Sequence, residues 1–245
     1  MLRFVRQRSR VVGALATPLV FWLVIGSGVG TSFQPQGWNA DGHYLQFGFT
    51  GTLVLIVLFT SIFSTISIIE DRQSGFLQGV LVAPVGRAAV VWGKVLGSTT
   101  LAVGQSTLFL FLAPLTGIPL SIGSVAATLG VLVILGVGLS ALGFAIAWSL
   151  DSTQGFHAIM NLFLIPMWLL SGAFFPASGA ARWVRGLMAL NPLTYGVSAL
   201  RSAVYSGGAK LDAPIPPMPF SLAVSVGFCA ATIAISLWVA ARRVE

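Results

Sequence analysis

Six apolar stretches without a single Asp, Glu, Lys or Arg constrain this chain more than any other feature of its sequence. Each contains about the 20 residues that an α-helix needs to cross roughly 30 Å of hydrocarbon. A charged residue near the centre of such a helix costs about 2.5–3.5 kcal/mol on insertion, so charge-free stretches are what lipid-exposed helices require. The predicted transmembrane helices cover residues 11–30, 46–69, 95–115, 122–150, 156–175 and 220–241.

Composition leads to the same fold class. Among 245 residues, 56% are hydrophobic and 8% are charged, whereas a soluble domain carries about 25% charged residues. A soluble fold of this size could not bury so much apolar surface. We therefore predict an all-α integral membrane protein with six transmembrane helices, organised as one transmembrane domain over residues 1–245. The single cysteine, Cys229, excludes a disulfide within one chain.

The distribution of basic residues predicts the orientation in the membrane. Arginines precede the first apolar stretch and follow the last one, and the loop 70–94 is also basic, whereas the loop 31–45 has no Lys or Arg. Because Lys and Arg stay on the cytoplasmic side, both termini, the loop 70–94 and the turn at Asp151 are predicted to be cytoplasmic. Asp151 is expected to cap the fifth helix. The net charge of +7 comes without a basic face of interleaved aromatic residues, so membrane lipid is the expected partner and nucleic acid is not.

The segment 176–219 departs from this charge rule, because it is predicted to be external and is nevertheless basic. Asn191 followed by Pro192 is typical of a helix N-cap with proline at the first helical position. Apolar and polar residues then alternate with a helical period, which predicts an amphipathic helix of about three turns within an external helical region at 178–206. Two placements fit: the helix lies on the outer membrane face, or it re-enters the bilayer partway. The basic residues of the segment are Arg182, Arg185, Arg201 and Lys210.

The loop 70–94 is longer than a simple reversal of the chain requires. A charged cluster at residues 70–72 precedes a short amphipathic helix whose apolar residues include Phe76 and Leu77, and Pro84 interrupts it. An apolar knob framed by charge fits two interpretations equally well. One is a docking surface for a soluble partner, and the other is an interfacial helix that rests on lipid headgroups.

The sequence carries no sign of catalysis or ion coupling. Gly93-Lys94 is followed by Val95 and lacks the first glycine of a Walker A loop, so no ATPase is predicted in this chain. The two histidines, His43 and His157, have no partner at metal-ligand spacing, and no metal site is expected. Ion-coupled transporters usually keep charged groups within the membrane, and the absence of such groups from the predicted helices favours an external energy source.

Three stretches of the chain resemble the membrane subunits of type-2 ABC exporters, a family that includes drug-resistance, nodulation-factor and polysaccharide-export permeases. They occur in the family's order and spacing over essentially the whole chain, and the likeness is greatest to daunorubicin-resistance permeases. Gln73 and Gln78 stand where this family often carries acidic residues, so a less charged partner surface is expected. The matching stretches are EDRQSGFLQGVLVAPVGR at 70–87 with Gly93-Lys94 downstream, LSGAFFP at 170–176, and NPLTY at 191–195 with ALR at 199–201.

The resemblance implies a permease that pairs with a second copy of itself or a close paralogue, above two cytoplasmic ABC ATPase subunits that bind ATP and Mg. It also implies a shortened N-terminal interfacial segment, a cytoplasmic coupling helix between the second and third helices, and external re-entrant helices between the fifth and sixth. The implied ATPase-coupling residues are Glu70, Asp71, Arg72, Gly75, Phe76, Leu77, Leu81, Pro84, Arg87 and Lys94. The implied external gate comprises Phe174, Phe175, Asn191, Pro192, Tyr195 and Arg201. The second and fifth helices would line the substrate path, where we expect Phe59, Phe63, Asn161 and Met167.

The predicted function is export of an amphipathic or hydrophobic substrate of the drug, lipid or glycolipid class. The substrate would leave the cytoplasm or inner leaflet of a bacterial cytoplasmic membrane, with energy from the separate ATPase and no cofactor in this chain. The alternative is an ATP-independent membrane channel or carrier. Copurification of a soluble ATPase with the chain discriminates between the two.

Overall fold

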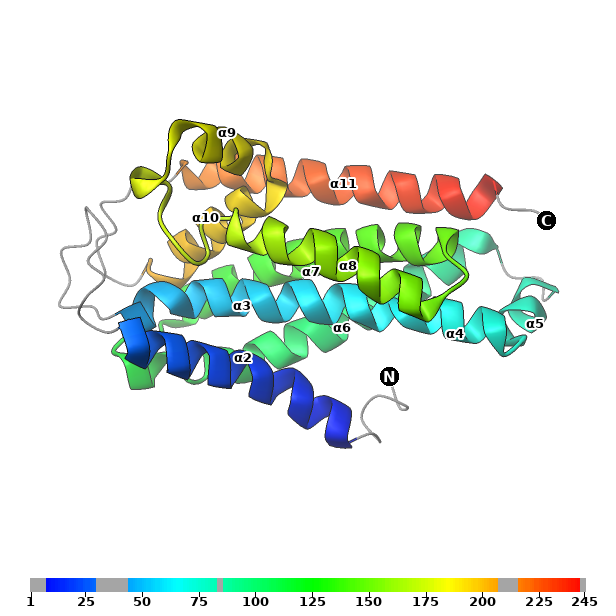
Figure 1. Ribbon diagram of the computed structural model, residues 1–245, viewed down its shortest axis with the longest axis horizontal. Helices are drawn as coiled ribbons and strands as arrows, with labels where there is room; N and C mark the ends of the chain where they lie inside the picture. Colours follow the sequence, from blue (N-terminus) through cyan, green and yellow to red (C-terminus); the bar gives the residue numbers. More distant parts are fainter. Residues whose placement is uncertain (1–7, 30–43, 83–85, 207–215, 243–245) are drawn as a thin grey trace.

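The computed structural model describes residues 8–29, 44–82, 86–206 and 216–242, and every regular element within these ranges is helical. The long helices lie side by side and form an elongated bundle (Figure 1). The helices are α2 (Arg8–Val29), α3 (Tyr44–Phe63), η2 (Ser64–Ile66), α4 (Ser67–Gln73), α5 (Phe76–Val82), α6 (Arg87–Leu110), η3 (Ala113–Thr116), α7 (Ile122–Ser149), α8 (Thr153–Leu169), η4 (Ala177–Gly179), α9 (Arg182–Leu190), α10 (Pro192–Val204) and α11 (Met218–Arg242).

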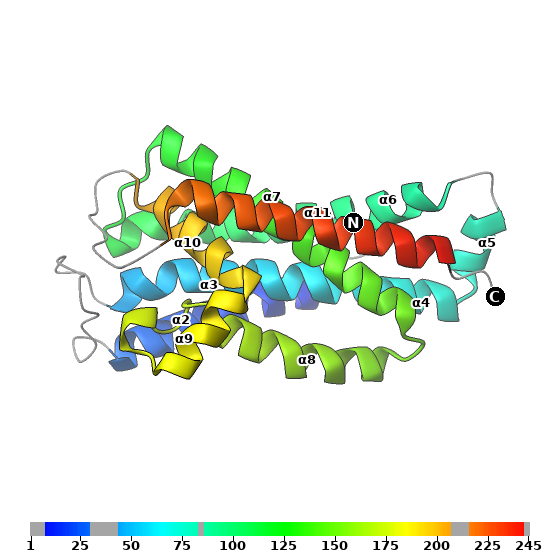
Figure 2. The same ribbon diagram turned by 90° about the horizontal axis from the view of Figure 1, so that it is seen from above.

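The short helices gather at the two ends of the bundle. At one end, α3 continues through the 3₁₀ turn η2 into α4, and α5 lies beyond it (Figures 1 and 2). The other end holds α9 and α10, and α10 packs beside the beginning of α11. We refer to these as the α4–α5 end and the α9–α10 end. The two segments that the sequence singles out as unusual, 70–94 and 176–206, therefore lie at opposite ends of the molecule.

Three helical stretches of the described residues are long and apolar enough to cross a membrane. They are Tyr44–Gln73, Ile122–Ser149 and Met218–Arg242, with mean hydropathies of 2.4, 2.5 and 2.1. Within α2, a shorter apolar stretch covers Pro18–Gly28. The predicted fifth span at 156–175 overlaps α8, which begins earlier, at Thr153, and ends earlier, at Leu169. The all-helical prediction is confirmed, and the count of six spans stays a prediction.

Side-chain caps define where several helices begin. Ser121 accepts a hydrogen bond from the Ser124 amide (3.0 Å) at the start of α7, and the Ser124 hydroxyl accepts one from the Ser121 amide (2.9 Å) in a reciprocal capping box. Ser152 caps α8 by accepting from the Gly155 amide at 3.2 Å. Each cap satisfies amides that have no partner within the helix.

Helix α7 is the centre of the bundle, where it packs against α3, α6, α10 and α11. Gly143 permits its close approach to the α3–η2 junction, since a Cβ at this position would lie 2.8 Å from Thr65 Oγ1 and 3.1 Å from Ile62 Cα. Small residues at helix contacts allow backbones to approach closely inside a membrane, where no hydrophobic force drives helices together. The phenyl rings of Phe49 and Phe109 stack at 4.9 Å in the same core.

Helix α10 differs from the expected amphipathic surface helix. Its predicted apolar stripe is buried, but Ser198, Arg201 and Tyr205 from the predicted polar stripe are each only 5% exposed. The helix packs against α3, α7 and α11 and is covered on both faces. An outer-surface placement is therefore wrong, and the helix is instead inserted among the ends of the long helices.

Candidate functional site

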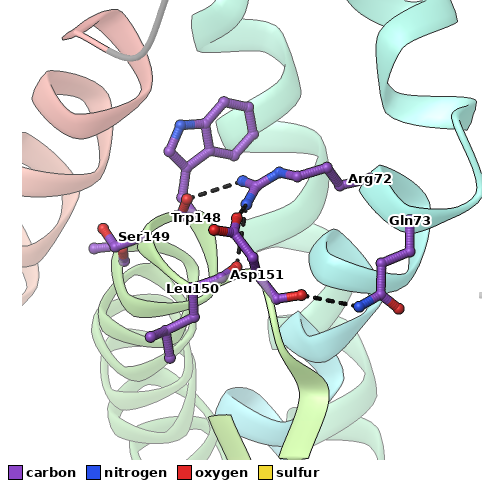
Figure 3. Close-up of polar contacts among 7 residues, drawn as sticks. Arg72, Gln73, Trp148, Ser149, Leu150 and Asp151 are labelled. Atoms are coloured by element: carbon purple, nitrogen blue, oxygen red, sulfur yellow. Dashed lines mark hydrogen bonds and ion pairs between the residues drawn. The ribbon is translucent and has the colours of Figure 1, made fainter. Parts of the chain in front are cut away.

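Arg72, at the end of α4, binds the C-terminal end of α7 (Figure 3). Its guanidinium donates to the carbonyls of Trp148 (2.8 Å) and Leu150 (3.1 Å) and to Asp151 Oδ1 (2.8 Å). Gln73 Nε2 also donates to the Asp151 carbonyl, at 2.9 Å. The last carbonyls of a helix lack partners and carry partial negative charge, so a planar cation with several donors suits this position.

Two further basic side chains connect helices at the same end. Lys94 of α6 donates to Asp71 Oδ2 (2.5 Å) and to Ser67 Oγ (3.1 Å), which links α6 to α4. Arg87 donates to the carbonyl of Ala241 at 2.8 Å, close to the C-terminal end of α11. We call α4 and α5, with these three basic anchors, the basal platform. Its anchors tie α4 and α6 to the ends of α7 and α11.

The turn between α4 and α5 orients the exposed part of the basal platform. Gly75 adopts a φ of +75°, a left-handed conformation that residues with a Cβ rarely adopt. After this turn the Leu77 side chain is 5% exposed, whereas the Phe76 side chain is 61% exposed. The two residues, which we expected on one apolar face, therefore separate into an anchor and a projecting aromatic ring. Glu70 and Arg72 lie on α4, which packs against α5, and Lys94 binds α4 at Asp71.

Two predicted coupling residues, Leu81 and Pro84, are not fully described by the structure. Pro84 lies outside the described residues, and the structure describes the backbone of Leu81 within α5 but not its side chain. The other predicted coupling residues gather at the α4–α5 end, on α4, the turn at Gly75, α5 and the first turns of α6.

A second polar cluster surrounds Arg201 at the α9–α10 end. Its guanidinium donates to the Gly172 carbonyl (3.2 Å) and to Thr50 Oγ1 (3.4 Å), and it lies 4.3 Å from the centroid of the Phe47 ring. Arg201 is 5% exposed, so these contacts take the place of the water that its charged guanidinium would otherwise bind. It holds α10 to both α3 and the segment after α8.

The other predicted gate residues lie near this cluster. Phe174 accepts a hydrogen bond from Tyr44 at its carbonyl (3.1 Å), and its ring lies 6.0 Å from that of Trp168. Asn191 caps α10 by accepting from the Leu193 amide and donates to the Met167 carbonyl at 2.7 Å. The remaining gate residues are Phe175, which is partly buried between α8 and η4, Pro192 at the first position of α10, and Tyr195 one turn later.

The predicted path residues divide between two regions. Phe59 and Phe63 lie on α3 with ring centroids 5.5 Å apart, and the Phe63 ring stacks on His157 of α8 at 5.1 Å. Asn161 is exposed one turn further along α8. Met167 is partly buried near the other end of α8.

Sequence reasoning missed how Arg72 is held. Asp151 was expected to cap α8, but Ser152 is the cap and Asp151 binds Arg72 instead. The two carbonyls that complete the site, those of Trp148 and Leu150, belong to backbone groups that any residue would supply. The sequence offered one signal for this contact: Asp151 is the lone acidic residue of the 150–152 turn, and Arg72 is a basic residue just after the predicted span 46–69.

The helical bundle with its long apolar helices defines a multi-pass integral membrane protein. Residues 1–205 match the ABC-2 type transporter membrane family. The chain belongs to this family of ABC transporter permeases.

Relatives with transport names support the same assignment. The chain is 26% identical to the transport permease ycf38 of Cyanophora paradoxa over 80% of its own length and 68% of that protein. It is 22% identical to the daunorubicin resistance ABC transporter permease DrrB1 of Streptomyces coeruleorubidus, over 86% of this chain and 74% of that protein. It is 27% identical to the inner membrane transport permease YhhJ of Escherichia coli K12, over 64% of this chain and 41% of that protein.

Membership of this family fixes several properties of the chain. A permease domain of this kind has no ATPase activity of its own and requires no cofactor, and it works with an ABC ATPase. The predictions of family, of a non-enzymatic chain and of an ABC transporter permease are thereby confirmed.

Proposed function

We propose that the chain is the permease subunit of an ATP-driven exporter and that the basal platform receives the force of the ATPase. The observation that carries this proposal is the projecting Phe76 ring on a short helix whose base is fixed by Arg72, Arg87 and Lys94. An exposed aromatic ring on a firmly anchored element is the kind of residue that dominates protein interfaces. Two permease copies and two ATPase subunits form the working assembly.

The anchors give a physical route from α5 to the long helices. A push on Phe76 moves α5 and α4 together because Leu77 is buried and the α4–α5 turn is short. Arg72 passes this movement to the end of α7, and Lys94 passes it to α6. The ATPase thereby acts on several long helices through polar contacts confined to one end.

The topology in this proposal has six spans, with both termini and the basal platform in the cytoplasm. Helices α6 and α8 serve as the third and fifth spans, and α2 as the first. Arg87 and Lys94 lie in the first turns of α6 at the α4–α5 end, in keeping with retention of basic residues in the cytoplasm. The α9–α10 end is then external, and the Arg201 cluster with Phe174, Asn191 and Tyr195 forms the outer gate.

The substrate in this proposal is an amphipathic or hydrophobic molecule that passes between α3 and α8. Phe59, Phe63 and Asn161 present aromatic surface and a carboxamide along these helices, without any charged side chain. The Escherichia coli and Streptomyces relatives are named as an inner membrane transport permease and a daunorubicin resistance permease. These names fit a drug or lipid-like substrate in a bacterial cytoplasmic membrane.

The test compares two substitutions that each add one negative charge at the α4–α5 end of the full-length chain. Phe76→Asp places the charge on the projecting ring position, and Gln154→Asp places it on an exposed position in the first turn of α8. Loss of an aromatic hot spot costs about 2 kcal/mol or more, so Phe76→Asp should weaken ATPase binding roughly 30-fold or more. Gln154→Asp should leave binding within about threefold.

The assay is purification of the tagged permease with its coexpressed ABC ATPase, followed by measurement of the dissociation constant and of ATP-dependent transport in vesicles. Equal binding of both variants would show that the ATPase does not dock on the Phe76 side of α5. Transport that continues without ATP and without a copurified ATPase would establish the channel or carrier instead.

A further inference from the structure

Helix α9 (Arg182–Leu190) has an apolar face that the bundle does not cover. Met188 points into the protein and is 2% exposed, whereas Trp183, Leu187 and Leu190 are 71%, 43% and 82% exposed. At about 100° per residue, these three exposed side chains fall within a sector of roughly 60°. The helix lies at the edge of the α9–α10 end (Figures 1 and 2), so this face points away from the bundle.

Two arginines lie on the other side of α9: Arg182 is about 80° around the helix from Leu190, and Arg185 is about 140° from it. Arg182 and Arg185 are both exposed and lie about 60° apart around the helix, with Gly186 and Ala189 as small exposed neighbours. In the part of the chain that the structure describes, neither arginine forms an ion pair, and the acidic residues lie at the opposite, α4–α5 end. The two cations thus face outward without a protein counter-charge among the described residues.

Contacts from α10 fix the orientation of α9. Thr194 Oγ1 donates to the Met188 carbonyl (2.6 Å), and the Tyr195 hydroxyl donates to the Ala189 carbonyl (2.9 Å). Both bonds satisfy carbonyls at the C-terminal end of α9, where a helix has no internal partners. The exposed face and the two arginines are therefore presented in a fixed direction.

We propose that α9 is a binding site for an anionic phospholipid in the membrane leaflet at the α9–α10 end. Arg182 and Arg185 bind the lipid phosphate, and Trp183, Leu187 and Leu190 insert beside its acyl chains. Guanidinium groups match phosphate oxygens with paired hydrogen bonds, and tryptophan prefers the membrane interface. An amphipathic helix with arginines on its polar side and an aromatic and aliphatic face on the other has the composition of an interfacial lipid-binding helix.

The positive charges of Arg182 and Arg185 favour an anionic lipid over a second protein as the molecule that covers this face. A second protein covering Trp183 and Leu190 would have to bring its own acidic groups, whereas the bilayer supplies apolar chains and phosphate at adjoining depths. The long helix α11 begins at the same end of the bundle as α9, so the membrane boundary is already at this level. The site also explains why basic residues occur at the end where the charge rule disfavours them. It depends on membrane insertion and not on the proposed ATPase coupling.

The test uses the fluorescence of Trp183 in the full-length chain reconstituted into vesicles. The Trp183 signal is the difference between the wild-type protein and Trp183→Phe. Vesicles contain phosphatidylcholine and phosphatidylglycerol in a constant ratio, with bromine placed on the acyl chains of one lipid or the other. We expect brominated phosphatidylglycerol to quench Trp183 more strongly than brominated phosphatidylcholine does.

The double substitution Arg182→Gln and Arg185→Gln should reduce this preference by about fivefold to about thirtyfold, since each basic residue at an anionic surface contributes roughly a factor of five. Arg242→Gln removes an exposed cation from the α4–α5 end and serves as the charge control, which should keep the preference. Equal quenching by the two lipids in the wild type, an unchanged preference in the double variant, or an unquenched Trp183 would each overturn the proposal.

Discussion

Replacing Arg72 by methionine tests whether the basal platform is held mainly by helix carbonyls. The guanidinium makes two hydrogen bonds to the backbone at the end of α7 and one to Asp151. The Arg72 side chain is 25% exposed and that of Asp151 is 77% exposed, so the carboxylate is the more screened partner. Hydrogen bonds of a charged group contribute about 1.5–3 kcal/mol each when well buried. Allowing for solvent screening, we expect Arg72→Met to lower the free energy of local opening of α4 by about 2 kcal/mol.

Asp151→Asn is the matched variant, because it removes the charge partner and leaves both carbonyl bonds in place. An exposed ion pair contributes about 0–1 kcal/mol, so this variant should have a much smaller effect. The assay is amide hydrogen exchange of the peptides covering 67–82, followed by mass spectrometry. A loss of about 2 kcal/mol corresponds to exchange roughly 30-fold faster in Arg72→Met, with α9 and α10 unchanged. If Asp151→Asn accelerated exchange as much as Arg72→Met, the surface ion pair and not the helix carbonyls would hold the platform.

Two further predictions concern packing and capping. Gly143→Ala should lower the free energy of unfolding by about 1–3 kcal/mol, because its Cβ would overlap the Thr65 hydroxyl. A Cβ at Gly130 meets nothing within 4 Å, so the control Gly130→Ala should not lower the thermal unfolding midpoint. Equal midpoints for the two variants would refute the close contact at Gly143. Asn191→Ala should lower the midpoint by the equivalent of about 1–3 kcal/mol, since it removes both the α10 cap and the bond to the Met167 carbonyl. Asn191→Asp keeps a capping oxygen but loses the amide donor, so a wild-type midpoint for Asn191→Asp would show that the bond to Met167 contributes nothing.

The sequence was most informative where hydrophobicity alone determines structure. Ile122–Ser149 and Met218–Arg242 lie close to the predicted stretches, because α7 begins at the Ser121 cap and ends shortly before Asp151, and α11 ends at Arg242. The end of α8 at Leu169 could not be placed, since residues 170–175 are as apolar as the helix and only tertiary contacts decide that they turn. Likewise, Arg201 was expected on a polar face, and its burial depends on distant partners such as Thr50 and the Gly172 carbonyl.

The basic residues of this chain do more than set its orientation in the membrane. Arg72 and Arg87 bind carbonyls at the ends of α7 and α11, and Arg201 binds a carbonyl just beyond α8. A cation that satisfies the end of another helix makes the two helices move together, because separating them would leave both the charge and the carbonyls without partners.

This pattern distinguishes α8 from its neighbours at the α4–α5 end. Arg72 ties α7 to the basal platform, Lys94 ties α6 to it, and Arg87 ties α11 to α6. Helix α8 instead begins at a serine cap beside Asp151 and packs along α3. Helix α8 also exposes Asn161 and His157 on a surface that lipid would not solvate well. If the ATPase moves the basal platform, the tied helices follow it as a group, and the relative movement is concentrated between α3 and α8. The boundary that carries the proposed path residues Phe59 and Phe63 is thus the one that the charge network leaves free to open.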